Sequence, residues 1–239
     1  MGRLLRLDRL LPSGRKALIV AMDQPRAIYS AALADPGRVL DKLRSADVDG
    51  YLLSLSTARH VEGHLAGRPV VISISQDYQG AQQVVEQAVA FGASALKYEV
   101  YPYTEFETAT MRGMEALAVQ ADRWGLPVMA EVVPGGFDGV ALQTAVNLRD
   151  SVRRAAEAGA DIAKIPAPND GSLSEVTEYA SIPVLLLGGA RRGGLEEVLA
   201  RVRQLGPVAD GLVFGRYVVE DPDPAKVVAA LREALDSID

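Results

Sequence analysis

The sequence contains no cysteine, two histidines and few aromatic residues. Without cysteine the chain cannot form disulfides, bind iron–sulfur clusters or use a thiolate as nucleophile. It has no apolar run near the roughly 20 residues that span a bilayer, and its N-terminal residues lack the continuous apolar stretch of a signal peptide. We therefore expect a cytoplasmic protein that has no membrane partner.

Acidic residues outnumber basic residues, 31 to 25. The net charge is −6, and the arginines and lysines form no basic stripe, so we expect no nucleic-acid partner. Hydrophobic residues make up 49% of the 239 residues, which is enough for a substantial core. No linker, charge block or low-complexity tract divides the chain. The sequence predicts a single domain over residues 1–239, with residues 1–16 as an N-terminal extension that caps it.

Short apolar runs rich in β-branched residues recur along the whole chain. Several follow Gly, Pro or Asp and end on polar or turn residues, which is typical of strands. Because they are almost continuously apolar, we expect them to lie in a parallel sheet covered by helices. The predicted strands are residues 17–23, 50–56, 70–75, 95–101, 128–133, 162–166, 184–188 and 211–215.

Segments with a 3.6-residue apolar period separate these runs. The clearest cover residues 82–90, 111–124, 141–158, 195–205 and 225–235, whereas residues 57–67 predict only a short helix. Eight strands that alternate with helical segments indicate an α/β protein with a (β/α)8 TIM barrel. A doubly wound open sheet is the alternative. In a barrel, functional residues gather at the C-terminal ends of the strands.

Lysine is scarce, yet two of the five lysines lie in predicted buried strands. Lys97 follows Ala-Leu and precedes Tyr-Glu-Val-Tyr-Pro, and Lys164 lies in Asp-Ile-Ala-Lys-Ile-Pro. Burial disfavours a charged amine, so we expect a lowered pKa and a neutral, nucleophilic form. Two amines placed close together would also repel, which lowers the pKa of one of them. This pattern indicates an enzyme that forms a Schiff base.

Carboxylates occur at matching places in other strands. Asp23 ends the first strand and Glu131 lies in the fifth, next to the strands of Lys97 and Lys164. We expect these four side chains to converge on one inner face with two charges of each sign, since an unpaired ion away from water costs several kcal/mol. Tyr101 lies on the same face as Lys97 because alternate strand residues share a face. Tyr98 should face the helices.

Structural interpretations of the same residues stay open. An ion pair with Asp161 or Glu131 would satisfy Lys164, and one with Glu131 or Glu99 would satisfy Lys97, without any catalysis. In the same way, an aspartate before Gln-Pro, as at the end of the first strand, can serve as a helix cap.

Glycines and arginines follow the last two strands. Gly188 and Gly189 end the seventh strand, with Arg191 close behind, and Gly215 and Arg216 end the eighth. Backbone N–H groups at helix starts after these two strands form the usual phosphate site of such barrels. The structural alternative is that these glycines only make tight turns.

Two histidines, His60 and His64, stand four residues apart in His-Val-Glu-Gly-His. This spacing can place two metal ligands on one helical face, but it is not the metalloprotease signature, in which glutamate directly follows the first histidine. The pair also lies after the second strand, away from the lysines. We interpret it as part of a solvated surface and expect no metal site.

Several motifs occur in an order that resembles the class I aldolases related to archaeal fructose-bisphosphate aldolase, tagatose-bisphosphate aldolase and sulfofructose-phosphate aldolase. The resemblance runs from about residue 17 to the C-terminus. The motifs are Ala-Met-Asp23-Gln24, Leu-Lys97, Tyr101-Pro, Ala-Glu131-Val, Ala-Gly-Ala-Asp-Ile-Ala-Lys164-Ile, the Gly-Gly turn and Ala-Asp-Gly-Leu-Val-Phe-Gly215-Arg216.

The resemblance implies roles for these residues. Lys164 would form the Schiff base, and Lys97 with Glu131 would assist proton transfer, as in the tagatose-type members. In the archaeal members a tyrosine does this work, which corresponds to Tyr101; we favour Glu131 because Lys97 accompanies it. Asp23 would orient the imine-forming lysine or substrate hydroxyls.

The same resemblance implies which residues bind the substrate. Gln24 would contact substrate, and the residues Gly188, Gly189, Arg191, Gly215 and Arg216 would hold a phosphate. The implied activity is cleavage or formation of a C–C bond in a ketose phosphate, with dihydroxyacetone phosphate as donor and no cofactor or metal. Such barrels commonly assemble through their outer helices, so we expect a homo-oligomer. The alternatives are a non-catalytic phosphosugar-binding barrel and a phosphosugar isomerase or synthase that forms no imine.

Overall fold

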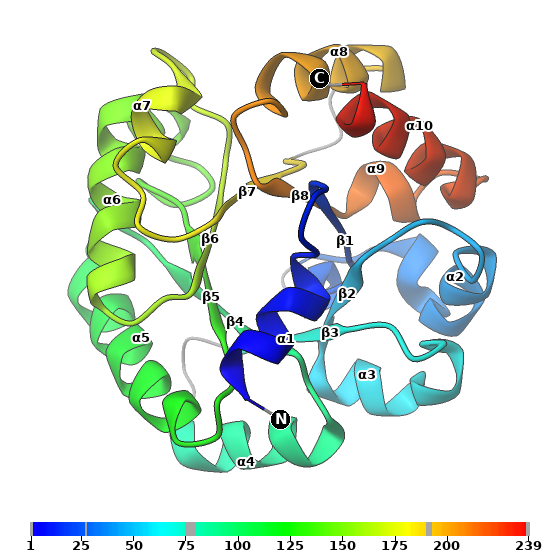
Figure 1. The fold of residues 1–239 in the computed structure, drawn as a ribbon, viewed down its shortest axis with the longest axis horizontal. Helices are drawn as coiled ribbons and strands as arrows, with labels where there is room; N and C mark the ends of the chain where they lie inside the picture. Colours follow the sequence, from blue (N-terminus) through cyan, green and yellow to red (C-terminus); the bar gives the residue numbers. More distant parts are fainter. Residues whose placement is uncertain (1, 27, 75–79, 190–192, 238–239) are drawn as a thin grey trace.

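The fold is a closed parallel barrel surrounded by helices (Figure 1). The computed structural model describes residues 2–26, 28–74, 80–189 and 193–237. Strands that are neighbours in the sequence are neighbours in the barrel, and β8 closes it against β1. The predicted TIM barrel is confirmed, and the open doubly wound sheet is excluded. The strands are β1 (Ala17–Ala21), β2 (Gly50–Ser54), β3 (Val70–Ser73), β4 (Ala95–Val100), β5 (Val128–Val132), β6 (Ile162–Ile165), β7 (Val184–Leu187) and β8 (Gly211–Phe214).

Each strand begins at the predicted residue and ends one or two residues earlier than predicted. The starts are marked by the change from a turn residue to an apolar run. The predicted ends lie too late because the sequence pattern does not mark them: a helix begins directly at Leu55, and the Tyr101 N–H donates to Thr110 Oγ1 instead of to a neighbouring strand. Leu55 and Tyr101 lie at the C-terminal mouth of the barrel.

Helices cover the outside of the barrel. The five predicted helices are present within four residues of their expected ends, and residues 57–67 contain little helix, as expected. Two helices of four or five residues, α7 and α9, are too short to show a periodic pattern. The helices are α1 (Arg3–Leu10), α2 (Pro36–Lys42), α3 (Leu55–His60), α4 (Ala81–Phe91), α5 (Glu107–Asp122), α6 (Ala145–Glu157), α7 (Leu173–Thr177), α8 (Leu195–Leu205), α9 (Arg216–Val219) and α10 (Pro224–Asp236).

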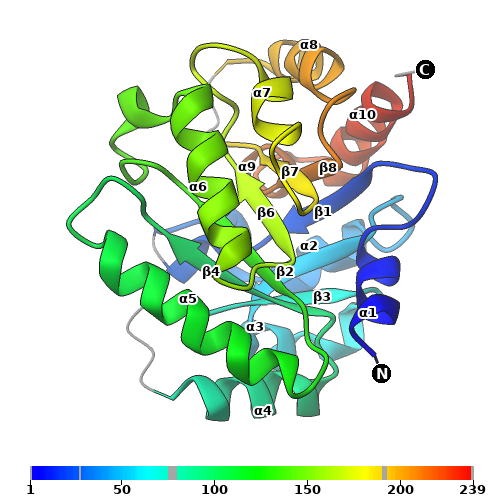
Figure 2. The ribbon, with the colours of Figure 1, turned by 60° about the vertical axis from the view of Figure 1, so that its left-hand side comes forward.

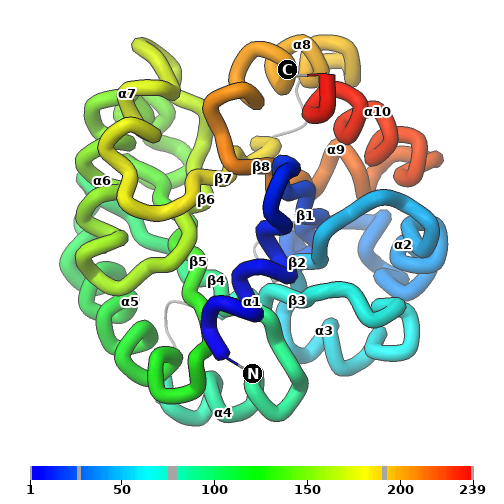
Figure 3. The backbone as a smooth tube through the Cα atoms, viewed as in Figure 1, coloured from blue at the N-terminus to red at the C-terminus, as the bar shows by residue number. Residues whose placement is uncertain are grey.

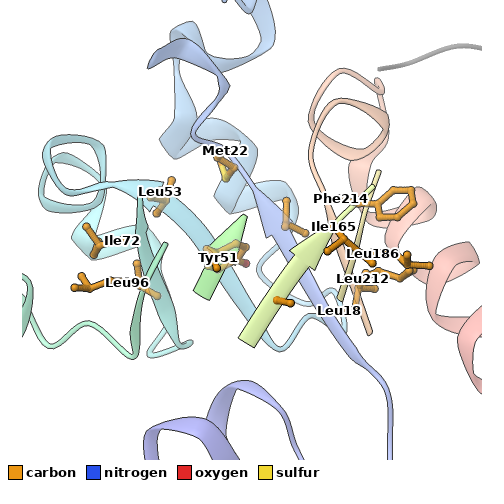
Figure 4. Packing of buried hydrophobic residues seen from close by; sticks show 14 of the residues in the cluster. Leu18, Met22, Tyr51, Leu53, Ile72, Leu96, Ile165, Leu186, Leu212 and Phe214 are labelled. Carbon is orange, nitrogen blue, oxygen red and sulfur yellow. The ribbon is translucent and has the colours of Figure 1, made fainter. Parts of the chain in front are cut away.

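Outward-facing strand residues form one large apolar layer with the inner faces of the helices (Figure 4). Leu18, Ile72 and Leu96 are fully buried there. Tyr98 also points outward, and its hydroxyl lies so close to Gly113 of α5 that a Cβ atom at position 113 would overlap with it. The prediction that Tyr98 packs against the helices is confirmed.

Inward-facing strand residues form a second, smaller apolar cluster inside the barrel. It fills the N-terminal half of the interior and leaves the C-terminal half to polar residues. The apolar cluster comprises Leu10, Ala17, Ile19, Ala21, Leu52, Val71, Ala95, Met129, Ile162, Leu185 and Val213.

The N-terminal helix α1 lies across the N-terminal end of the barrel (Figures 2 and 3). Its last residue, Leu10, is fully buried and belongs to the interior cluster. A Cβ atom at Gly50, the first residue of β2, would lie 3.0 Å from Leu10 Cδ1. Arg6 donates to the carbonyl oxygen of Ala93 before β4. These contacts place α1 as a cover on the barrel end that is remote from the polar residues.

We predict that Leu10→Ala lowers the free energy of unfolding by about 2–5 kcal/mol, because it leaves a cavity beneath the barrel interior. Leu4 is 74% exposed on the same helix, so Leu4→Ala should change the free energy by no more than about 0.5 kcal/mol. Urea unfolding of both variants measures the difference. Equal effects of the two substitutions would contradict the role assigned to Leu10.

Candidate active site

A cluster of charged side chains occupies the C-terminal half of the barrel interior. Glu99 on β4 pairs in register with Glu131 on β5, and Glu131 pairs with Lys164 on β6. Lys97 lies one inward position below Glu99 on β4, and Asp23 follows β1. Residues in register on neighbouring strands point to the same side, so three adjacent strands present this charged row to the interior.

Lys164 and Glu131 form a buried ion pair. The distance between Lys164 Nζ and Glu131 Oε1 is 2.7 Å, and the two side chains are 7% and 5% exposed. The amine therefore lies inside the barrel beside a carboxylate, as the sequence predicts, and not on the outer wall. Asp161, the other partner considered for Lys164, instead accepts from the backbone N–H of Val128 and pairs with Arg3 at the opposite end of the barrel.

Lys97 is the centre of the cluster. Its Nζ lies 2.6 Å from Glu131 Oε2, 2.5 Å from Glu99 Oε1 and 3.2 Å from Asp23 Oδ2. Its side chain is 2% exposed. The Oγ atom of Ser73, at the end of β3, lies 3.5 Å away. Lys97 thus connects β1, β3, β4 and β5, and the convergence of Asp23, Lys97, Glu131 and Lys164 is confirmed.

The carboxylates raise the pKa of the Lys97 amine. Burial alone lowers this pKa, but the nearby negative charges, of which Glu131 acts most strongly, outweigh it. The expectation of a lowered pKa is therefore wrong for Lys97, which stays protonated. In return, although burial raises the pKa of Glu131 and Asp23, the positive charges of the two lysines prevail, and both pKa values are lowered.

Glu99 and Tyr101 extend the cluster towards the mouth. The Tyr101 hydroxyl donates to Glu99 Oε2 at 2.8 Å, and Glu99 Oε1 accepts from Lys97. The ring of Phe137, in the loop after β5, meets Tyr101 edge-on with centroids 6.1 Å apart. Alternation along β4 predicts that Glu99 shares the face of Lys97 and Tyr101, but it indicates no functional role for this residue. Ser73 was overlooked altogether, although its position at a strand end was a usable signal.

The Gln24 side chain lies between the C-terminal ends of β1 and β8. Its Nε2 donates to the Ala21 carbonyl oxygen at 3.0 Å, and a Cβ atom at Gly215 would overlap with this nitrogen. The lack of a side chain at Gly215 thus allows the Gln24 amide to approach β8 closely. Among the described residues, no group forms a hydrogen bond with the buried Oε1 of Gln24. The structure therefore brings these two predicted substrate-binding residues together.

Local structure favours glycine at the two positions that follow β7. A Cβ atom at Gly188 would lie 2.9 Å from the Phe214 ring, and Gly189 has φ +67°, which favours glycine. Arg216 begins α9 and is half-buried. Arg191 lies outside the described residues. Gly188, Gly189, Gly215 and Arg216 therefore all lie at the C-terminal ends of β7 and β8, where the predicted phosphate site would be.

The two histidines lie apart from the charged cluster. His60 ends α3, and His64 Nδ1 lies 2.9 Å from Asp41 Oδ1 at an exposed position. In the part of the chain that the structure describes, no group of three histidine or acidic side chains is arranged to hold a metal ion. The described helices also include none that is long and apolar enough to cross a membrane.

A family model for DeoC/LacD family aldolases matches residues 17–220 of this chain. The chain belongs to the DeoC/LacD aldolase family. The match begins at the first residue of β1 and ends just after α9, so it covers the whole barrel and every residue of the charged cluster. The resemblance drawn from the motifs is confirmed, and the enzyme class is that of the aldolase-type lyases.

Relatives with assigned names include more than one aldolase-type enzyme. The chain is 28% identical, over 98% of its length and 90% of the relative's, to 2-amino-4,5-dihydroxy-6-oxo-7-(phosphonooxy)heptanoate synthase from Streptomyces griseus. It is 29% identical to the class 1 fructose-bisphosphate aldolase of Thermoproteus tenax, over 84% of this chain and 80% of that one. The family is thus shared by enzymes of different substrates.

Solved structures agree with this assignment. An archaeal fructose 1,6-bisphosphate aldolase superposes with a TM-score of 0.83 and 26% identity, covering 99% of this chain and all of the other. A second archaeal fructose-1,6-bisphosphate aldolase, with a TM-score of 0.81 and 26% identity over 98% and 99% of the two chains, has its catalytic lysine covalently bound to a carbinolamine intermediate.

We predict that Lys97→Met lowers the free energy of unfolding by about 3–5 kcal/mol at pH 7, because it leaves buried carboxylates without their shared cation. In the folded wild type, the pKa values of Asp23 and Glu131 lie below those in the unfolded chain, which are about 4. This difference stabilises the fold at pH values above about 4, and the contribution is lost as the pH falls below about 4. In the variant these carboxyls can take up protons, so its deficit should shrink between pH 7 and about pH 4.

Denaturant unfolding at several pH values measures this deficit. Lys226 is exposed on α10, and Lys226→Met serves as the matched control with an expected change within about 0.5 kcal/mol at every pH. A deficit of Lys97→Met that is independent of pH would contradict the assigned role of the cluster.

Proposed function

We propose that this protein is a class I aldolase in which Lys164 forms a Schiff base with a ketose phosphate, with dihydroxyacetone phosphate as the donor. The observation that carries the proposal is the 2.7 Å contact between Lys164 and Glu131 inside the barrel, with a second lysine, whose pKa is raised by the carboxylates around it, on the other oxygen of Glu131. An amine beside a proton acceptor is the arrangement that covalent catalysis by lysine needs.

Schiff-base formation follows from this pair. Glu131 takes a proton from the Lys164 ammonium, and the neutral amine attacks the ketone carbon of the substrate. Glu131 then returns this proton to the carbinolamine hydroxyl, which leaves as water, and a protonated imine beside an ionised Glu131 results. Because the cluster retains its carboxylates, it stabilises the positive charge of the imine.

C–C cleavage then uses the imine as an electron sink. A base removes the proton of the C4 hydroxyl, the C3–C4 bonding electrons move into the imine, and an aldehyde leaves. The enamine that remains is protonated and hydrolysed to dihydroxyacetone phosphate, which frees Lys164; synthesis runs in reverse. We assign the base to Glu131, since Tyr101 already donates its hydroxyl proton towards Glu99. General acid–base help of this kind contributes roughly 10²–10⁴-fold.

Two sets of features support a phosphorylated donor. The names of the relatives include a bisphosphate and a ketone next to a phosphonooxy-bearing carbon. In this chain, glycine-rich turns follow β7 and Arg216 follows β8, where barrel enzymes commonly bind phosphate. The buried Gln24 amide oxygen provides an acceptor for a substrate hydroxyl at the end of β1.

The proposal includes a cytoplasmic homo-oligomer without a nucleic-acid or membrane partner. The net charge of −6 disfavours phosphate-rich polymers. On the outer helices and the turn after α5, Val119, Trp124 and Val146 expose about half of their surface or more, which supports contact with a second copy.

We predict that borohydride reduction in the presence of dihydroxyacetone phosphate traps a stable adduct on Lys164. Mass spectrometry of peptides locates it. Lys164→Met should form no adduct and lose turnover by at least about 10⁴-fold while keeping its fold. An adduct on Lys97 instead, with an active Lys164→Met variant, would show that the two amines have exchanged roles; no adduct on any lysine would favour a binding protein or an imine-free isomerase.

We predict that Arg216→Met raises KM for dihydroxyacetone phosphate by about 10–100-fold, the effect of one charge-assisted hydrogen bond. Turnover of unphosphorylated dihydroxyacetone should stay within about two- to threefold of the wild type, because this donor has no phosphate for Arg216 to bind. Initial rates of aldol synthesis with each donor measure both effects. An equal rise in KM for both donors would remove Arg216 from the phosphate site.

A further inference from the structure

We infer that Glu99 selects the aldehyde partner by charge: it admits aldehydes whose remaining groups are hydroxyl or ammonium and excludes those that carry a phosphate. This inference rests on the proposed function, because it concerns the second substrate of the same site. It is carried by the place of Glu99 in the barrel, by the charge of its surroundings and by its exposure at the mouth.

The strand order gives the direction in which the substrate extends. A donor phosphate bound after β7 and β8 lies next to β6, where Lys164 holds the ketone carbon. The carbons beyond the ketone must then run away from β7 and β8 across the barrel, towards β3 and β4. Glu99 lies at this far side, in register with Glu131 and one strand further from Lys164. The aldehyde end of the substrate therefore reaches Glu99.

The charged cluster has more negative than positive groups. Two lysines face three carboxylates, so one negative charge is in excess even when both amines carry a proton. The excess is not spread evenly. Asp23 and Glu131 are 12% and 5% exposed, whereas Glu99 is 26% exposed, the most of the three carboxylates. An anionic group would meet a like charge here, and a hydroxyl or ammonium group would meet a hydrogen-bond acceptor.

Glu99 is not required to hold the reacting amine. Lys164 contacts Glu131, and Lys97 keeps Glu131 and Asp23 as partners when the charge of Glu99 is removed. A glutamine at this position retains one oxygen that can accept from Lys97 or Tyr101. The substitution Glu99→Gln therefore removes the charge with little change of shape, and its effect on the choice of aldehyde can be separated from its effect on the rate.

The experiment compares kcat/KM for aldol synthesis from dihydroxyacetone phosphate with D-glyceraldehyde and with D-glyceraldehyde 3-phosphate. These aldehydes differ only in the phosphate. The wild type should prefer glyceraldehyde, and Glu99→Gln should shift the ratio towards the phosphorylated aldehyde by about 10–100-fold, the effect of one like charge at close range. Glu99→Asp, which keeps the charge, should retain the wild-type preference. A purely structural role of Glu99 would lower both rates and leave the ratio unchanged.

Glu105, an exposed residue of the loop after β4, provides the matched control. Glu105→Gln removes one negative charge from the loop that follows the strand of Glu99 and should not change the ratio. The inference is overturned if the wild type prefers the phosphorylated aldehyde, if Glu99→Gln leaves the ratio unchanged, or if the wild type accepts neither aldehyde.

Borohydride trapping with dihydroxyacetone phosphate alone distinguishes failure of the inference about Glu99 from failure of the proposed function. An adduct on Lys164 in both the wild type and Glu99→Gln, together with an unchanged ratio, overturns the role of Glu99 and leaves the aldolase mechanism intact. No adduct on Lys164 overturns the proposed function and the inference with it. An adduct in both proteins with the expected change in ratio supports both.

Discussion

The bond between Lys97 and Glu131 is the interaction on which the barrel interior depends. Three carboxylates could not share this space without a buried cation, because each buried unpaired ion costs several kcal/mol. Lys97 is that cation, held at 2.6 Å from Glu131 and kept protonated by its neighbours. Burial raises the pKa of Glu131, but the charge of Lys164 and, after it, that of Lys97 lower it. In the proposed mechanism, Lys97 thus prepares the environment in which Lys164 reacts.

The fold could be predicted because each strand is a recognisable apolar run in the sequence. An apolar run after a turn residue defines where a strand begins, and all eight starts were placed correctly. Strand ends could not be predicted as well, because the backbone partner changes without a change in the sequence pattern: the Tyr101 N–H donates to Thr110 Oγ1 of α5, and α3 begins directly at Leu55. Helix α9 has four residues, less than two turns, so no periodicity could reveal it.

The candidate site was only partly predictable. Strand position was enough to bring Asp23, Lys97, Glu131 and Lys164 together. It could not give the pKa of Lys97, which depends on distances of 2.5–3.2 Å to three carboxylates and reverses the effect of burial. The role of Glu99 was missed for a related reason: a face can be assigned from alternation, but the exposure of one residue on that face cannot.

The helix that seals the far end of the barrel also governs access. Leu10 and the apolar cluster fill the N-terminal half of the interior, so the charged residues can be approached only from the C-terminal end of the barrel. In the proposed mechanism, reactants, products and the water lost and regained at Lys164 must therefore all pass the C-terminal end of the barrel. The donor stays covalently bound to Lys164 when the aldehyde forms, so in cleavage the aldehyde departs first and in synthesis it arrives last.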